Sequence, residues 1–183
     1  LLAGAASAQS WRIDAWTSRA GLPSDSLNML LPLADGHLLV TSFYEPPTLF
    51  DGHAFRPLHL AADTSGILRG ASVAAQTSDG VLWFGTRDHG LVRVDRDGSL
   101  HPVPLAGGSE GLDVRALQVG SDGTLHVGTA SGWFALHDPT GGADVRAPAD
   151  ELAKLPVSAI FEDRGGRIWL GGDRGLRVVE AGR

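Results

Sequence analysis

Residues 77–94 read TSDGVLWFGTRDHGLVRV, and residues 161–179 repeat this order of residues as FEDRGGRIWLGGDRGLRVV. In both stretches a turn glycine precedes an apolar run with a tryptophan, and two further glycines separate this run from a second one. Aligning the whole chain on the turn glycine gives four copies at spacings of 44, 43 and 43 residues, which pivot on Gly36, Gly80, Gly123 and Gly166. A fixed period in this range with β-type content predicts the blades of a β-propeller.

Each copy divides into up to four short apolar runs, which predict the four strands of a blade. The first strand of each copy is expected at 26–33, 71–78, 114–121 and 157–164, and the second starts at His37, Val81, Thr124 and Arg167. The third is expected at 91–95, 133–138 and 176–180, and the outer strand at 54–60, 100–105 and 143–148. Asp-Gly at three joins, and Gly165-Gly166 at the fourth, predict tight primed turns with a positive φ.

The run VLWFG at 81–85 is apolar on both faces of a strand, because Val81 and Trp83 alternate with Leu82 and Phe84. A strand of this kind must be covered on both sides, as in a blade stacked between two others. The glycine that closes the run, at Gly85, Gly128 and Gly171, is expected to let a large aromatic side chain of a neighbour approach the backbone. The predicted fold class is therefore all-β, with four consecutive four-stranded blades.

The composition agrees with this architecture and excludes several functions. The chain has 183 residues, 43% of them hydrophobic, with 25 glycines and no cysteine. Its net charge is −6 and its basic residues are scattered, so nucleic acid is not an expected partner. No apolar stretch reaches the length of about 18 residues that a membrane-spanning helix needs.

The two ends of the repeat region carry separate expectations. LLAGAASAQS at 1–10 is typical of the end of a secretory signal, with Ala6-Ser7-Ala8 as the cleavage pattern, so 1–8 is assigned to the signal peptide and 9–183 to the propeller. WRIDAWT at 11–17 is expected to be the outer strand of the blade that closes the ring. APADELAKLP at 147–156 is the one candidate helical turn.

The repeat resembles that of the two-component regulator propeller family. The matching stretches are GLPSDSL at 21–27, SDGVLWFGTRDHGL at 78–91, SDGTLHVGT at 121–129 and GGRIWLGGDRGL at 165–176. Copy one departs from the pattern with Leu39, Thr41 and Ser42 and with the loop FYEPP at 43–47, and copy three has His126 in the tryptophan position. The resemblance implies a fragment of a seven-bladed propeller; an unusual four-bladed ring is the alternative.

The resemblance also implies a role. Such propellers form the extracytoplasmic, periplasmic sensor of bacterial histidine kinases or diguanylate cyclases, which a membrane helix anchors in the inner membrane. We therefore expect a non-catalytic input module that senses a small-molecule or oligosaccharide ligand, needs no cofactor or metal, and acts through downstream signalling domains or a dimer partner. The alternatives are a propeller lyase or hydrolase of a polysaccharide or small cyclic substrate, and a protein-interaction scaffold.

Ligands of propellers usually bind at the face where the loops after the second and fourth strands emerge. The residues expected on this face as candidate ligand contacts are Tyr44, Glu45, Arg69, Arg87, Asp88, His89, Arg115, Asp173 and Arg174, with Ser24, Asp25, Phe43 and Asp113 nearby. Aromatic rings there could stack on a sugar, and arginines could bind carboxylate or sulfate in a forked geometry. The other interpretation is solvated loop tips with local ion pairs.

Three apparent motifs are weak. Residues 107–111 read GGSEG, which fits G-x-S-x-G but lacks the strand before it and the helix after it that a nucleophile elbow requires. Asp95 and Asp97 resemble part of a calcium loop without its remaining ligands. The seven histidines lack the spacing of a zinc site.

Overall fold

The computed structural model describes residues 12–61, 66–105, 113–137, 144–146 and 154–180. The first sheet contains β1 (Leu27–Pro32), β2 (Leu38–Ser42), β3 (Thr48–Phe50) and β4 (Phe55–Pro57), and the second β5 (Val73–Gln76), β6 (Leu82–Gly85), β7 (Leu91–Val94) and β8 (Leu100–Val103). The third contains β9 (Val114–Val119), β10 (Leu125–Thr129), β11 (Trp133–His137) and β12 (Asp144–Arg146), and the fourth β13 (Ala159–Glu162), β14 (Ile168–Gly172) and β15 (Gly175–Val179). Each of these strands except β3 overlaps a predicted one, since no third strand was predicted for copy one.

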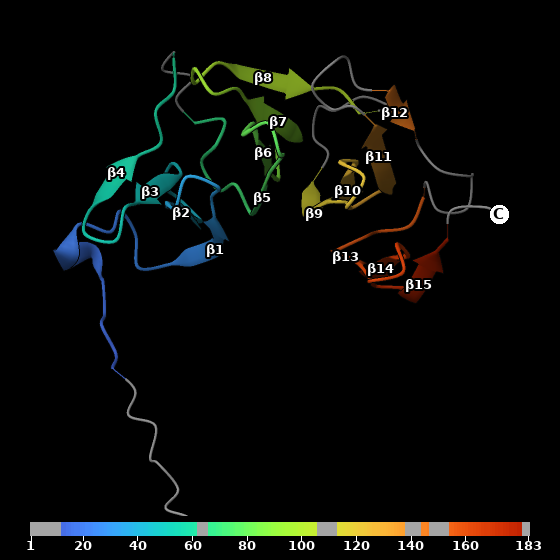
Figure 1. Cartoon of the computed structure of the whole chain (residues 1–183), viewed down its shortest axis with the longest axis horizontal. Helices are drawn as coiled ribbons and strands as arrows, with labels where there is room; N and C mark the ends of the chain where they lie inside the picture. Colours follow the sequence, from blue (N-terminus) through green and yellow to red (C-terminus); the bar gives the residue numbers. More distant parts are fainter. Residues whose placement is uncertain (1–11, 62–65, 106–112, 138–143, 147–153, 181–183) are drawn as a thin grey trace, which may run out of the picture.

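The strands of each sheet follow one another in sequence order, and all neighbours are antiparallel. The four sheets stand side by side in an open arc, with β1, β5, β9 and β13 on its concave side and β4, β8 and β12 on its outside (Figure 1). The predicted all-β fold with four consecutive blades is thus confirmed, although the fourth blade has three strands in the described residues. The arc does not close, so the four-bladed ring is not what these sheets form.

The first hairpin of each blade is built in the same way in all four copies. The amide of the pivot glycine donates to the carbonyl three residues earlier, as in Gly36 to Leu33 at 3.0 Å and Gly80 to Thr77 at 2.8 Å. The pivots have φ between 75° and 89°, so the predicted positive φ is confirmed. The predicted primed turn is wrong: the loop has three residues, and the glycine follows a turn instead of forming its second central position. The Asp-Gly pair alone does not distinguish a two-residue primed turn from this three-residue loop.

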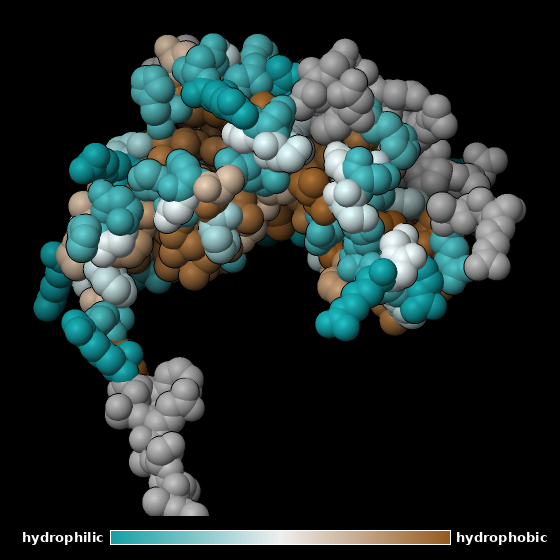
Figure 2. Space-filling view, in the orientation of Figure 1, coloured by the Kyte–Doolittle hydropathy of each residue, from teal (hydrophilic) through white to brown (hydrophobic). Residues whose placement is uncertain are grey.

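The core lies between the blades rather than within any one sheet. Trp83 is fully buried against Leu125 and Val127 of the third blade, whereas Leu82 and Phe84 pack with Leu39 of the first. The second blade is therefore covered on both sides, as the sequence predicts. Figure 2 shows apolar side chains between the sheets, with hydrophilic ones around them.

The glycine that ends the second strand has a different neighbour from the expected aromatic ring. A Cβ on Gly85 would lie 2.5 Å from Val114, and a Cβ on Gly128 would lie 2.8 Å from Val157. Both valines come from the segment that begins the next blade. The prediction of an aromatic neighbour is therefore wrong, and the close approach itself is present because a valine packs directly on the backbone.

The last blade leaves its outward face open in this structure. Phe161, Leu176 and Val178 are 62%, 67% and 44% exposed. Trp169, the counterpart of Trp83, is half-buried on this side and donates its Nε1–H to Asp163 at 2.9 Å. The contrast shows that the burial of the repeat's tryptophan comes from the following blade.

Three sequence expectations concern the ends of the chain and a connecting segment. The signal peptide at 1–8 lies outside the described residues, as does most of the candidate helical turn at 147–156. The described part of that turn, 154–156, contains no helix. The outer strand expected at 11–17 is not present in its described part, 12–17, and its pairing with a closing blade stays a prediction. A short 3-10 helix follows at Ser18–Ala20.

Candidate functional site

An open hollow of about 400 Å³ lies between the first and second blades, at the edge opposite the pivot glycines. Three stretches of chain enclose it: the β2–β3 loop, the end of the β4–β5 connection, and the β6–β7 loop. Its lining residues are Asn28, Phe43, Tyr44, Gly66, Arg69, Gly70, Ser72, Thr86, Arg87, Asp88 and His89. We call this site the interblade hollow.

Buried hydroxyl groups hold the two strand-connecting loops of the hollow in place. Thr86 Oγ1 donates to the carbonyl of Gly90 at 3.0 Å and accepts from the amide of His89 at 2.9 Å. In the first blade, Ser42 Oγ accepts from the amide of Glu45 at 3.1 Å. The hydroxyl thus satisfies backbone groups of the loop that follows it, so the loop tips are presented from a fixed base.

The end of the β4–β5 connection forms hydrogen bonds with both blades. The amide of Ser72 donates to Gly85 at 3.0 Å, and Asn28 Nδ2 donates to the carbonyl of Ala71 at 3.3 Å. Gly70 has φ of 68° and passes so close to the first blade that a Cβ would lie 3.1 Å from the carbonyl oxygen of Phe43. A side chain there would meet both backbone strain and a tight contact.

The structure brings five of the predicted contact residues together in the hollow, namely Tyr44, Arg69, Arg87, Asp88 and His89. Phe43, expected nearby, also lines it. The remaining four do not: Glu45 lies in the same loop outside the lining, Arg115 is paired with Asp113 at 2.8 Å, and Asp173 and Arg174 form the β14–β15 turn of the last blade. Asp25 accepts hydrogen bonds from Ser18 and does not line the hollow.

Sequence reasoning missed five lining residues, which are Asn28, Gly66, Gly70, Ser72 and Thr86. Asn28 carries a signal, because an amide stands where the apolar run of an inner strand has just begun. Thr86 is also visible as the polar residue that ends the second strand. The two glycines and Ser72 lie in an irregular connection whose path no repeat pattern specifies.

The arginines of the hollow differ from Arg93 and Arg167, which are held in ion pairs. Arg93 is 2.7 Å from Asp95, and Arg167 is 2.7 Å from Asp163. Each pair lowers the pKa of its aspartate, most of all for Asp163, where the Trp169 hydrogen bond is the first cause. In the described ranges, neither Arg69 nor Arg87 has a carboxylate within ion-pair distance. Among the described residues, these two guanidinium groups of the hollow form no ion pair.

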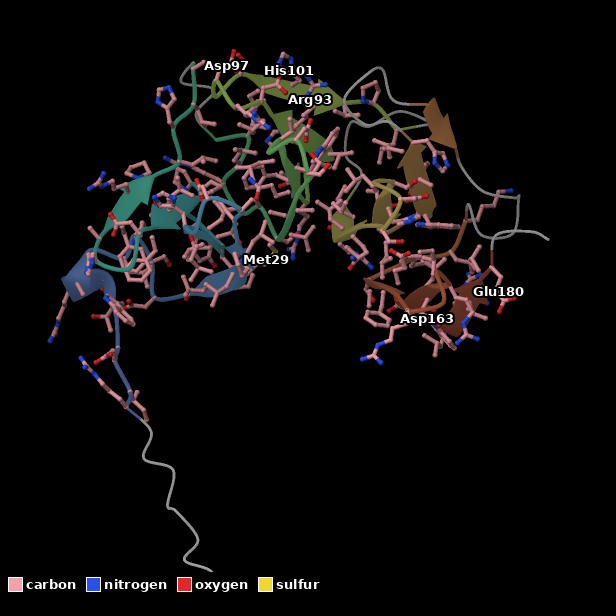
Figure 3. The ribbon with its side chains drawn as sticks, in the orientation of Figure 1. Met29, Arg93, Asp97, His101, Asp163 and Glu180 are labelled. Atoms are coloured by element: carbon pink, nitrogen blue, oxygen red, sulfur yellow. The ribbon has the colours of Figure 1, made fainter. Side chains whose placement is uncertain are left out.

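The paired charges lie away from the hollow. Figure 3 shows Arg93 and His101 together on the outer strands of the second blade, where Asp95 also lies 3.1 Å from His101. Asp163 and Glu180 lie in the last blade, and both approach Arg167. These ion pairs connect strand ends and hairpins and involve no residue that lines the hollow.

Two features are absent from the described part of the chain. It contains no group of three or more His, Asp or Glu side chains that could hold a metal ion. No helix within the same ranges has the length and apolar character needed to cross a membrane.

A family model, "Two component regulator propeller", matches residues 151–174. This segment leads into the fourth blade and contains its first hairpin and β14. This part of the chain is similar to a two component regulator propeller repeat. The resemblance seen in the sequence is thereby confirmed, while among curated proteins none matches the chain by sequence.

Solved structures show the same architecture. The extracellular domain of BT4673 from B. thetaiotaomicron, described as a hybrid two component system, is 18% identical with a TM-score of 0.69, over 89% of this chain and 22% of that one. BT3049 from the same organism, similarly described, is 18% identical with a TM-score of 0.68, over 87% and 21%. The chain thus spans about a fifth of the length of these domains.

The propeller fold is shared with an enzyme as well. Virginiamycin B lyase from Staphylococcus aureus is 13% identical with a TM-score of 0.61, over 87% of this chain and 57% of the lyase. Identities this low establish a common fold and leave function to the site.

Proposed function

We propose that this chain is the ligand-sensing part of an extracytoplasmic, periplasmic β-propeller receptor, and that it is not itself catalytic. The observation that carries the proposal is the interblade hollow, which five of the predicted contact residues line, in a chain whose residues 151–174 match a two component regulator propeller model. The descriptions of BT4673 and BT3049 as extracellular domains of two component systems support the same role.

The position of the hollow suggests how binding is transmitted. Its walls belong to two different blades, Tyr44 in the first and Arg87 in the second, so a ligand that touches both favours one packing of these blades over others. In the full-length protein this bias would reach a partner chain or the output domain across the membrane.

The lining offers little for catalysis. His89 and Asp88 are exposed loop residues, and His89 forms no ion pair with a described carboxylate that could orient it as a base. General acid–base work needs positioned groups around the reacting atoms. A binding site requires only a surface and a charge that are complementary to the ligand.

Thermal shift measurements on the protein with a panel of neutral and acidic oligosaccharides and organic acids test the proposal. A specific ligand raises the melting temperature because it binds only the folded state. The same mixtures are then analysed by chromatography. We expect a shift with unchanged ligand; turnover of the ligand would indicate the lyase or hydrolase alternative, and no response to any compound would favour a protein-interaction scaffold.

A further inference from the structure

We infer that the interblade hollow recognises an anionic ligand, one that carries a carboxylate or sulfate group beside a flat apolar face. The inference rests on the proposed ligand-binding role and adds the chemical class of the ligand. It follows from the arrangement of two arginines and two aromatic rings around the same hollow.

The charge of the hollow favours an anion. Arg69 and Arg87 reach it from two different segments, and Asp88 is the one acidic residue among the described residues of its lining. With the histidine neutral, the described residues of the lining carry a net positive charge within a chain whose net charge is −6. A guanidinium binds carboxylate and sulfate through paired N–H donors, which makes arginine suited to such groups.

The aromatic side chains supply the second half of the site. Phe43 and Tyr44 are 53% and 74% exposed, although neighbouring Ser42 is buried, and their ring centroids lie 6.3 Å apart at 47°. Exposed rings beside a hollow offer stacking surface to a ligand ring, and tyrosine adds a hydroxyl at its polar end. Both come from the loop that departs from the repeat pattern.

The backbone that carries these side chains is held in place before a ligand binds. The backbone that carries Arg87 is fastened by the buried Thr86 hydroxyl, and the backbone next to Arg69 packs at Gly70 against Phe43. Ligand binding therefore has to order side chains alone, which reduces its entropic cost. Carboxylate and sulfate share this recognition chemistry, so an experiment must distinguish them.

Isothermal titration calorimetry with glucuronate, glucose 6-sulfate and uncharged glucose separates charge from ring shape. We expect heat from one or both acidic probes and none from glucose, with affinity that falls as sodium chloride is raised. The stronger acidic probe identifies the preferred anion. Equal binding of glucose would overturn the inference and leave ligand sensing intact.

Substitutions locate the binding. Arg69→Gln and Arg87→Gln remove exposed cations without opening a cavity, and each should weaken the acidic probe by about tenfold or more. Arg164→Gln, an exposed arginine in the first hairpin of the last blade, is the matched control and should change nothing. Binding that survives both hollow variants would overturn the inference, as would a lack of binding by every probe, which would also count against the proposed function.

Discussion

The carboxylate of Glu162 accepts hydrogen bonds of 2.6 Å from both the amide and the hydroxyl of Ser121, a residue of the preceding blade. The same link joins the first two blades, where Gln76 Oε1 accepts from the amide of Ala34 at 2.8 Å. In each case the acceptor stands four residues before its pivot glycine. The blades are thus tied at the hairpin edge by side chain to backbone bonds, in addition to their apolar contacts.

Replacing Glu162 with alanine should lower the free energy of unfolding by about 1–2 kcal/mol, because the Ser121 amide and hydroxyl lose a charged acceptor. Glu162→Gln keeps an acceptor and should recover part of this loss. Urea unfolding followed by tryptophan fluorescence measures both. Equal stability of the alanine variant and the parent would show that the inter-blade link contributes nothing.

Gly128→Ala and Gly171→Ala form a matched pair. The first Cβ would lie 2.8 Å from Val157, whereas the second has Ala159 as its nearest contact at 3.5 Å. We expect a loss of about 1–3 kcal/mol for Gly128→Ala, since the packed valine must move, and little change for Gly171→Ala. Thermal melts of the two variants measure the stability loss at each position. A similar loss at both positions would contradict the idea that the valine of the following blade packs on this glycine.

Thr129→Val and Thr41→Val test the loop-fastening hydroxyl. Thr129 Oγ1 accepts from the amide of Gly132 at 2.9 Å, while the buried Thr41 Oγ1 finds no partner in the described structure. Thr129→Val should therefore cost about 1–3 kcal/mol, and Thr41→Val should be neutral or stabilising. Chemical unfolding gives both values; the reverse order would mean that these hydroxyls do not govern the loops.

Acidification should destabilise the interface between the third and fourth blades. Burial lowers the pKa of His126 from its usual 6.5, against the opposing effect of Asp122 and Glu162, and its ring stacks on Trp133 at 5.6 Å. The unfolded chain then binds the proton first, so stability from this group is present above pH 6.5 and is lost as pH falls toward the lower folded pKa.

The control for this pH effect is His126→Phe, which removes the titrating group and keeps an aromatic ring. Its unfolding free energy should change less between pH 7 and pH 5 than that of the parent. Parallel pH profiles for the two proteins would show that His126 does not contribute.

The repeat pattern predicted the blades because each apolar strand is specified locally, by alternation and by a glycine that needs positive φ. Trp83 is an example: the residues around it are apolar on both faces of the strand, and this pattern predicts a strand that is covered on both sides. The neighbour of Gly85 was predicted incorrectly, because a single copy does not reveal which side chain of the next blade approaches it.

The candidate site was predictable only in part for the same reason. Tyr44 and Arg87 stand in loops of known order, so the repeat places them on one face. Their meeting with Arg69 depends on the path of the β4–β5 connection, which no periodicity determines. Asp173 and Arg174, at an equivalent loop, lie two blades away from the hollow and do not join it.

The location of the bound ligand is the most direct test of the account. Amide chemical-shift mapping with glucuronate follows every assigned backbone position at once. We expect shifts at Tyr44, at Gly66–Gly70 and at Arg87–His89, with none at the hairpin of Gly166. Shifts confined to the hairpin edge, or to the open face of the last blade, would contradict it.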